Sequence, residues 1–228
     1  MRKYSAFKHS VLMISLLCAT PFAAANWTID KGVLLDPNGQ PFIFRGVTID
    51  HEFAPDKTVQ AIKDAAGTGA NAVQIEINTD KFQHPTSGER VKAIVQACKQ
   101  SKVVCIFEPS TTAGYSIGRG STPAGVFMYW LLPGISEAIA GQQDYIMLGF
   151  GNQAMVEQRS ADYLRVMESY ILAMRQYFPD FLIFVDGNNW GQDTDKAMQT
   201  FARQNQANGT HTQNLIYSVE MFDAYNTP

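Results

Sequence analysis

The sequence is poor in several features that would assign it to a particular class of protein. Its 228 residues include only three cysteines, 17% charged residues and a net charge of -3 at pH 7. So few cysteines exclude a small domain that depends on disulfides for its stability. No block of Lys and Arg occurs, which argues against nucleic acid or an anionic membrane as a partner. No apolar run reaches the ~20 residues of a spanning helix, so we expect one globular domain.

The N-terminus has the three parts of a secretory signal peptide. Three cations lie within the first eight residues, an apolar stretch covers residues 11–19, and the alanines at 23–25 suit a cleavage site. We therefore expect residues 1–25 to be removed and a single domain of residues 26–228 to be secreted or periplasmic.

Short runs rich in Val, Ile, Leu and Phe alternate with segments of helical spacing, which predicts buried parallel strands covered by helices. Residues 27–30 and 33–36 flank Lys31 and Gly32 and predict an N-terminal β-hairpin that would plug one end of a barrel. The fold class is therefore α/β, an incomplete (β/α)8 TIM barrel with about six βα units. The predicted strands are residues 42–48, 72–77, 103–107, 145–150, 181–185 and 215–221. The predicted helices are residues 57–66, 87–100, 127–140, 161–178 and 194–205.

Two cysteines of the expected mature chain, Cys98 and Cys105, are seven residues apart at the end of a predicted helix and in the next strand. An oxidising compartment permits a disulfide between them. Two buried thiols packed as small apolar residues are an equally good interpretation. The sequence leaves both open.

The predicted strands end in amide, acidic and aromatic residues. In a parallel βα barrel the chemistry takes place just beyond the C-terminal strand ends. Aromatic faces stack on sugar rings and amides bond their hydroxyls, so these tips favour a carbohydrate site. No Cys or second His lies near His51 to complete a metal site, and we predict neither a metal nor a cofactor.

At this point the sequence resembles a known family. Residues 27–222 are similar to the N-terminal three quarters of a glycoside hydrolase family 5 enzyme of the endo-β-1,4-mannanase or cellulase type. The segments that carry the resemblance are residues 35–47, 55–58, 68–71, 98–99, 104–108, 151–152, 185–186, 189–193 and 218–219.

The resemblance implies a retaining glycosidase, which needs two carboxyl groups ~5 Å apart. In the family the general acid/base is the Glu of an Asn-Glu pair after the fourth strand, where this chain has Asn152 and Gln153. A carboxamide neither gives nor takes a proton at neutral pH. The family's nucleophilic Glu belongs to a seventh strand, which this sequence does not contain.

Further family positions are altered. The family's Arg of the second strand falls on Gln74, its His of the third strand falls on Ser110, and its His-x-Tyr of the sixth strand becomes residues 220–222. The substrate-binding residues that the resemblance leaves are His51, Asn152, Trp190, Glu220 and Phe222. The sequence thus predicts the scaffold of a glycosidase with degenerate catalytic positions.

Several of these residues have a second interpretation. Trp190 stacks on a sugar or packs beneath its own loop, and His51 is a site residue or a solvated loop histidine. Glu108 fits a buried carboxylate held by backbone N–H groups. A rearranged catalytic pair of Glu76 and Glu220 is the remaining route to hydrolysis, although their strands lie across the barrel from each other.

The expectation for function is therefore a secreted family 5-like protein that has lost hydrolysis and at most binds β-mannan or β-glucan. One alternative is an active retaining endo-β-1,4-glycanase with a rearranged or externally completed site. Another is a truncated fragment that has no function or binds a partner, since six strands leave two sheet edges through which the chain could form an oligomer.

Overall fold

The computed structural model describes residues 26–156, 159–208 and 213–221. The predicted signal peptide and Phe222 lie outside the described residues. Six parallel strands form one sheet in the order β3-β4-β5-β6-β7-β8, so every strand lies beside its neighbours in the sequence. These strands are β3 (Gly46–Asp50), β4 (Ala72–Ile77), β5 (Val104–Pro109), β6 (Ile146–Gly149), β7 (Ile183–Asp186) and β8 (Leu215–Ser218).

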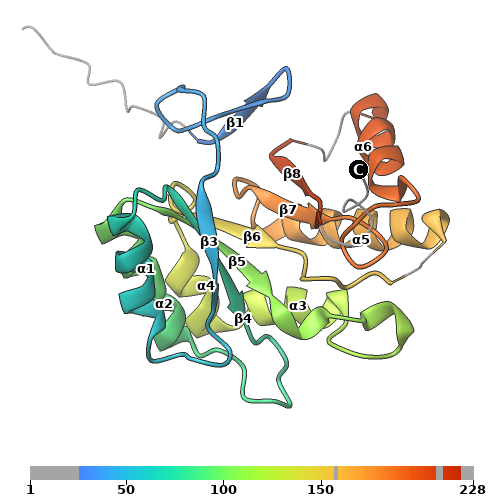
Figure 1. Ribbon diagram of the computed structural model, residues 1–228. Helices are drawn as coiled ribbons and strands as arrows, with labels where there is room; N and C mark the ends of the chain where they lie inside the picture. Colours follow the sequence, from blue (N-terminus) through green and yellow to red (C-terminus); the bar gives the residue numbers. More distant parts are fainter. Residues whose placement is uncertain (1–25, 157–158, 209–212, 222–228) are drawn as a thin grey trace, which may run out of the picture.

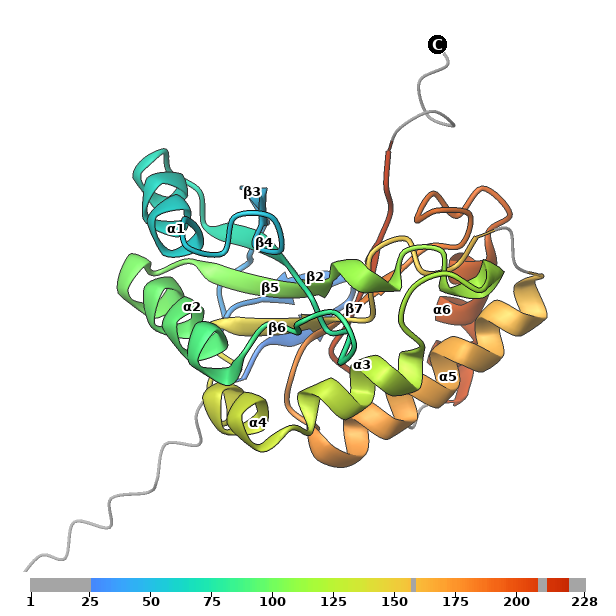
Figure 2. The ribbon, with the colours of Figure 1, turned by 90° about the horizontal axis from the view of Figure 1, so that it is seen from below.

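Helices follow the convex side of this curved sheet (Figures 1 and 2). The α-helices are α1 (Thr58–Gly67), α2 (Gly88–Ser101), α3 (Pro123–Trp130), α4 (Pro133–Ile139), α5 (Ser160–Tyr177) and α6 (Ala197–Asn208). The 3-10 turns η1 (Ser110–Thr112) and η2 (Tyr115–Ile117) follow β5. This is the incomplete α/β barrel that the sequence predicted. Among the described helices, none has the length and apolar composition needed to cross a membrane.

The prediction of one helix over residues 127–140 was wrong, because the segment is divided into α3 and α4. Pro133 opens α4, and the residue before it, Leu132, has an extended ψ of 133°. Proline disfavours helical geometry in the residue that precedes it and provides no N–H for a helix that continues from upstream. The first barrel strand is also shifted relative to the prediction: β3 covers Gly46–Asp50.

The predicted hairpin is formed by β1 (Thr28–Asp30) and β2 (Val33–Leu35), which pair antiparallel. Trp27 and Leu34 are buried in one apolar cluster with Ala72, Val104 and other residues from the N-terminal part of the sheet. Trp27 Nε1 donates a hydrogen bond to the carbonyl of Asp144 at 3.2 Å. The hairpin therefore covers the N-terminal end of the lumen, on the concave side of the sheet.

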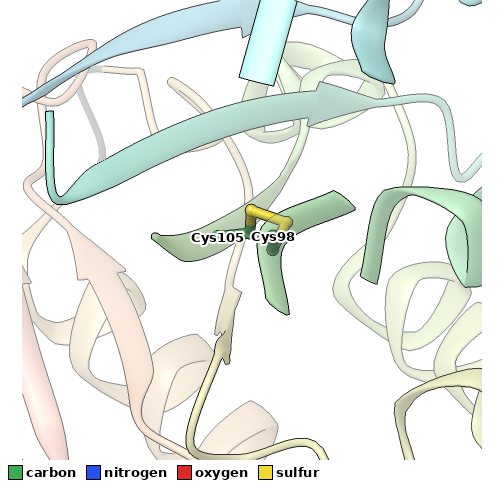
Figure 3. Close-up of a disulfide and its surroundings, with 2 residues drawn as sticks. All are labelled: Cys98 and Cys105. Carbon is green, nitrogen blue, oxygen red and sulfur yellow. A yellow bond between two sulfur atoms is a disulfide. The ribbon is translucent and has the colours of Figure 1, made fainter. Parts of the chain in front are cut away.

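Cys98 and Cys105 form a disulfide, the arrangement that the sequence left open. Cys98 lies in the last turn of α2, Cys105 lies in β5, and their Cα atoms are 6.1 Å apart (Figure 3). Both residues are buried in the layer between the sheet and the helices. The bond thus fastens α2 to the middle of the sheet.

Candidate functional site

Three acidic side chains stand in one row at the C-terminal end of the lumen. Asp50 of β3 is in register with Glu76 of β4, and Glu76 is in register with Glu108 of β5. Residues in register on neighbouring parallel strands point to the same face of a sheet. The alternating side chains of β4, namely Val73, Ile75 and Ile77, pack against the helices instead, so the three carboxylates face the lumen.

Glu108 is the most deeply buried of these acids. Its side chain is 1% exposed, and a Cβ atom built on Gly149 of β6 would lie 2.0 Å from its Oε2. The backbone N–H of Gly151 donates to the carboxyl group, while Oε1 has no hydrogen-bond partner among the described residues. Burial, and next the charge of Asp186, raises the pKa of Glu108 well above its ordinary value. Glu108 is thus a buried carboxyl group held by a backbone N–H, as predicted, and it favours the neutral form.

Asp186 ends β7 and shares this environment. It is 8% exposed, and burial followed by the charge of Glu220 raises its pKa from 3.8 to about 7. Hydrogen bonds from the side chain of Ser218 and from the backbone N–H of Gln153 act in the opposite direction. Asp186 therefore joins the tips of β7 and β8 to the loop that follows β6.

This loop contains the predicted Asn-Gln pair. Asn152 Nδ2 donates to Glu76 Oε1 at 3.0 Å, and its Oδ1 is buried without a partner among the described residues. Gln153 has a left-handed backbone with a φ of 50°, and its carbonyl accepts a hydrogen bond from the N–H of Gly114 at 3.1 Å. A non-glycine residue adopts this conformation only where its surroundings stabilise it. The backbone of Gln153 is thus fixed by hydrogen bonds to Asp186 at the end of β7 and to Gly114 in the loop after β5.

Glu76 and Glu220 complete the acidic lining. Burial, then the charges of Asp50, Glu220 and Glu52, raises the pKa of Glu76, against the effect of its hydrogen bond from Asn152. Burial also raises the pKa of Glu220, whose backbone N–H donates to the carbonyl of Gly191 at 2.8 Å. Among the described groups, no cation contributes to the pKa shifts of these two residues or of Glu108 and Asp186. The site is therefore a cluster of acids in which carboxyl groups retain protons at higher pH than usual.

Other predicted site residues have different surroundings. His51 is buried with its Nδ1 2.7 Å from Thr58 Oγ1, and burial lowers its pKa. This contact is at the start of α1, and the structure does not show His51 in contact with Asn152. Ser110 Oγ donates to Glu52 Oε2 at 2.5 Å, and this pair occupies the place where the resemblance expects a histidine.

Gln74 and Trp190 are both half-buried. Thr48 Oγ1 donates to Gln74 Oε1 at 3.5 Å inside the lumen, below Glu76 on the same strand. The backbone N–H of Trp190 donates to the carbonyl of Met155 at 3.0 Å, in the loop after β7. Phe222 lies outside the described residues.

The sequence analysis did not select Asp50, Glu52 or Gly149 as site residues. The signal for Asp50 was available, because Asp50, Glu76 and Glu108 each lie near the end of an apolar strand at a lumen-facing alternate position. Gly149 could not be recognised from the sequence, since its importance comes from a side chain 41 residues earlier that occupies the space beside it. No group of three or more potential metal ligands occurs among the described residues.

An open barrel of parallel βα units with acids and amides at the C-terminal strand ends has the architecture of an α/β-barrel glycoside hydrolase. Comparison with known proteins identifies the family. The model for cellulase, glycosyl hydrolase family 5, matches residues 35–227, and the chain belongs to this family.

Several relatives of the chain are named as mannanases. It is 29% identical to a mannan endo-1,4-beta-mannosidase from Cellvibrio japonicus over 98% of its own length and 52% of the relative. The catalytic domain of a mannanase from Streptomyces sp. SirexAA-E matches with a TM-score of 0.81 and 28% identity, over 98% of this chain and 69% of the other. A mannohexaose complex of Thermomonospora fusca beta-mannanase matches with a TM-score of 0.81 and 28% identity, over 90% and 68%. The chain thus spans about half the length of the first relative and two thirds of the solved domains.

Proposed function

We propose that this chain is a secreted family 5 protein that binds a β-linked mannan or glucan without hydrolysing it. Support for the ligand comes from relatives named as mannosidases and from a related structure with bound mannohexaose. Support for secretion comes from the signal-peptide pattern of residues 1–25.

One observation carries the proposed loss of hydrolysis. Gln153 follows Asn152 at the tip of β6, and its backbone donates to Asp186 and accepts from Gly114. The loop is therefore fixed in place, and the resemblance to the family assigns the Gln153 amide to the position where a retaining glycosidase needs a titratable group. An amide can bond the glycosidic oxygen, but it cannot protonate the leaving group or activate water.

Binding would depend on Asn152 and Glu76. Asn152 Oδ1 is a buried acceptor without a partner among the described residues, which is a destabilising state. A sugar hydroxyl that donates to this oxygen would remove that cost. Glu76 is half-buried and keeps oxygens available for further hydroxyls, and Trp190 would provide a stacking surface.

The test combines turnover with binding. The chain, without its signal peptide, is incubated with mannan and with cellulose, and the released reducing ends are counted. Mannohexaose and cellohexaose binding are measured by calorimetry on the same preparation. We expect binding and no release. Gln153→Glu should also be inactive, because one carboxyl group at this position cannot supply both the acid/base and the nucleophile of a retaining glycosidase. Reducing ends above the blank in the original chain would contradict the proposal.

A second candidate function is hydrolysis through a rearranged pair, Glu76 and Glu220. The observation in its favour is that the charge of Glu220 raises the pKa of Glu76, so the two groups interact electrostatically. This function predicts turnover that Glu76→Gln and Glu220→Gln each abolish. The matched control is Glu137→Gln on α4, outside the acidic cluster; it should leave any turnover unchanged.

A further inference from the structure

The side chains that line the lumen change from apolar to acidic toward the C-terminal end of the sheet. Ile106 of β5 and Phe184 of β7 belong to the apolar cluster beneath the hairpin. Alternate residues of a strand face the same side, so the next residues on this face are Glu108 and Asp186. Acidic side chains therefore lie beside an apolar layer, where charges are screened less than in water.

Five acids form the acidic cluster at this end of the lumen: Asp50, Glu76, Glu108, Asp186 and Glu220. The first three are in register on adjacent strands, which lie ~4.8 Å apart in a sheet. The charge of Glu220 acts on Glu76, Glu108 and Asp186. Glu108 and Asp186 are buried, whereas the other three are half-buried or exposed. Three acids are thus open to a ligand, and two buried acids add their charge beside them.

The described part of the chain supplies no cation to this cluster. None of its members takes part in the ion pairs that the described residues form, which are Arg90 with Asp56 and both Arg159 and Arg165 with Asp162. The acids follow the strand ends in a row, with Asp50, Glu76 and Glu108 on successive strands. A ligand that carries positive charge along an extended chain would match this arrangement.

A separate observation shows that the same place lacks hydrogen-bond donors. Oε1 of Glu108, a side chain that is 1% exposed, has no partner among the described residues. Oδ1 of Asn152 has none either, and Nδ2 of this amide donates to Glu76 at 3.0 Å. Both unpartnered atoms are acceptors, so a ligand that satisfies the site must bring donors.

An ammonium group provides both the charge and the donors. It has three N–H donors and no acceptor. A hydroxyl group has only one donor, and its lone pairs would face carboxylate oxygens. Hydrogen bonds between an ammonium group and a carboxylate are also roughly twice as strong as those between neutral groups.

We propose that the acidic cluster binds the ammonium group of an amino sugar, so that the glycan bound by this chain is a β-linked polymer that contains glucosamine-type units. The inference rests on the proposed function, from which it takes the β-linked chain of sugars. It adds the substituent by which the site selects its ligand. Asn152 and Trp190 keep the roles proposed above, while Asp50, Glu76 and Glu220 gain a partner of opposite charge.

The experiment compares two ligands that differ in this substituent alone. Binding of the β-1,4-linked glucosamine hexamer and of cellohexaose to the chain without its signal peptide is measured by calorimetry at pH 5, with mannohexaose as a third ligand. We expect the glucosamine hexamer to bind at least tenfold more tightly than cellohexaose. Its binding should also release protons, because carboxyl groups that retain protons give them up beside a cation; repeating the titration in buffers of different ionisation enthalpy measures this release.

Two variants locate the ammonium group. Glu76→Gln and Glu220→Gln keep the shape of each side chain and should each weaken binding of the glucosamine hexamer at least fivefold, with a much smaller change for cellohexaose. Glu137→Gln is the matched control, because it removes the same charge from the exposed face of α4, and it should change neither affinity. Near-UV circular dichroism shows whether each variant is folded, and the comparison of ligands on the original chain needs no variant.

The outcomes separate this inference from the proposed function. Equal affinity for the glucosamine hexamer and cellohexaose overturns the inference and leaves glycan binding in place, whereas no binding of any of the three ligands overturns both. Equal weakening in Glu137→Gln would assign the preference to the overall charge of the protein and overturn the inference. Displacement of the hexamer by calcium chloride, but not by sodium chloride of equal ionic strength, would assign the cluster to a metal ion and overturn it as well.

Discussion

The carboxyl group of Glu108 fills the space in which a side chain at Gly149 would lie. A Cβ atom on Gly149 would be 2.0 Å from Oε2 of Glu108. The two residues lie on neighbouring strands, β5 and β6, so the absence of a side chain on one strand allows an acid on the other to be buried. This contact fixes the position of the acidic lining of the lumen.

Gly149→Ala should therefore destabilise the fold. The new methyl group must displace a buried carboxyl group that the backbone of Gly151 holds, and overpacking of this kind costs ~1–3 kcal/mol. Urea unfolding measures the change. Gly67→Ala is the control, because a Cβ there meets nothing within 4 Å and lies in a helix, where alanine is favoured. Equal stability of the two variants would show that Glu108 does not occupy this space.

The pH dependence of stability should follow Asp186. Its pKa is raised from 3.8 to about 7 by burial and by Glu220, so between these pH values the folded state binds a proton that the unfolded state has released. Unfolding free energy then falls as pH rises from about 4 to 7, by up to ~1.4 kcal/mol per pH unit for this group.

Asp186→Asn removes this proton linkage. The unfolding free energy of the original chain minus that of the variant should therefore decrease as pH rises from about 4 to 7. His51, whose lowered pKa changes stability with pH in the opposite direction, is present in both proteins, so its contribution cancels. Chemical unfolding at several pH values provides the measurement. A constant difference from pH 4 to 7 would mean that Asp186 is not buried as described.

The disulfide should contribute to stability mainly by restricting the unfolded chain. Cys98 and Cys105 are seven residues apart, and closure of a loop this short is worth ~2–3 kcal/mol in the chain-entropy model. Reductant should lower the unfolding free energy by this amount. The Cys98→Ala/Cys105→Ala double variant is the control and should not respond to reductant. The same response in both proteins would assign the effect to something other than the bond.

Asn152→Ala should weaken binding of mannohexaose about tenfold, the loss expected for one hydrogen bond of ~1.4 kcal/mol. It also removes the donor to Glu76, so the pKa of Glu76 should rise further. Calorimetry and a pH titration of binding measure both effects. Gln96→Ala, on the exposed face of α2, is the control. Unchanged affinity in Asn152→Ala would remove Asn152 from the binding site.

The strands could be predicted because parallel strands buried on both faces are nearly continuous apolar runs, as in β5, where every residue is buried. β3 was misplaced because residues 42–44 are apolar for another reason. Phe42 and Phe44 pack against the cluster under the hairpin, outside the strand. The break between α3 and α4 could have been predicted from Pro133. The helical spacing of apolar residues continues through residues 127–140 and obscured this signal.

The site was predictable at the level of strand tips. Asn152 and Gln153 follow a predicted strand, and Glu76 and Glu220 lie near the ends of two others. The structure places these residues at the tips of β6, β4 and β8. The pairing of Ser110 with Glu52, and the contact of His51 with Thr58, depend on loop conformations that no periodicity encodes. Such contacts arise only after the strands have fixed where each loop begins and ends.

The central claim is that an amide occupies the position of the general acid/base and that turnover is lost. The most direct measurement is incubation of the domain with mannohexaose in ¹⁸O-labelled water, followed by mass spectrometry of the products. The account predicts intact mannohexaose and no labelled shorter oligosaccharide, in a preparation that binds the hexasaccharide. Labelled mannobiose or mannotriose that accumulates in proportion to protein concentration would contradict it.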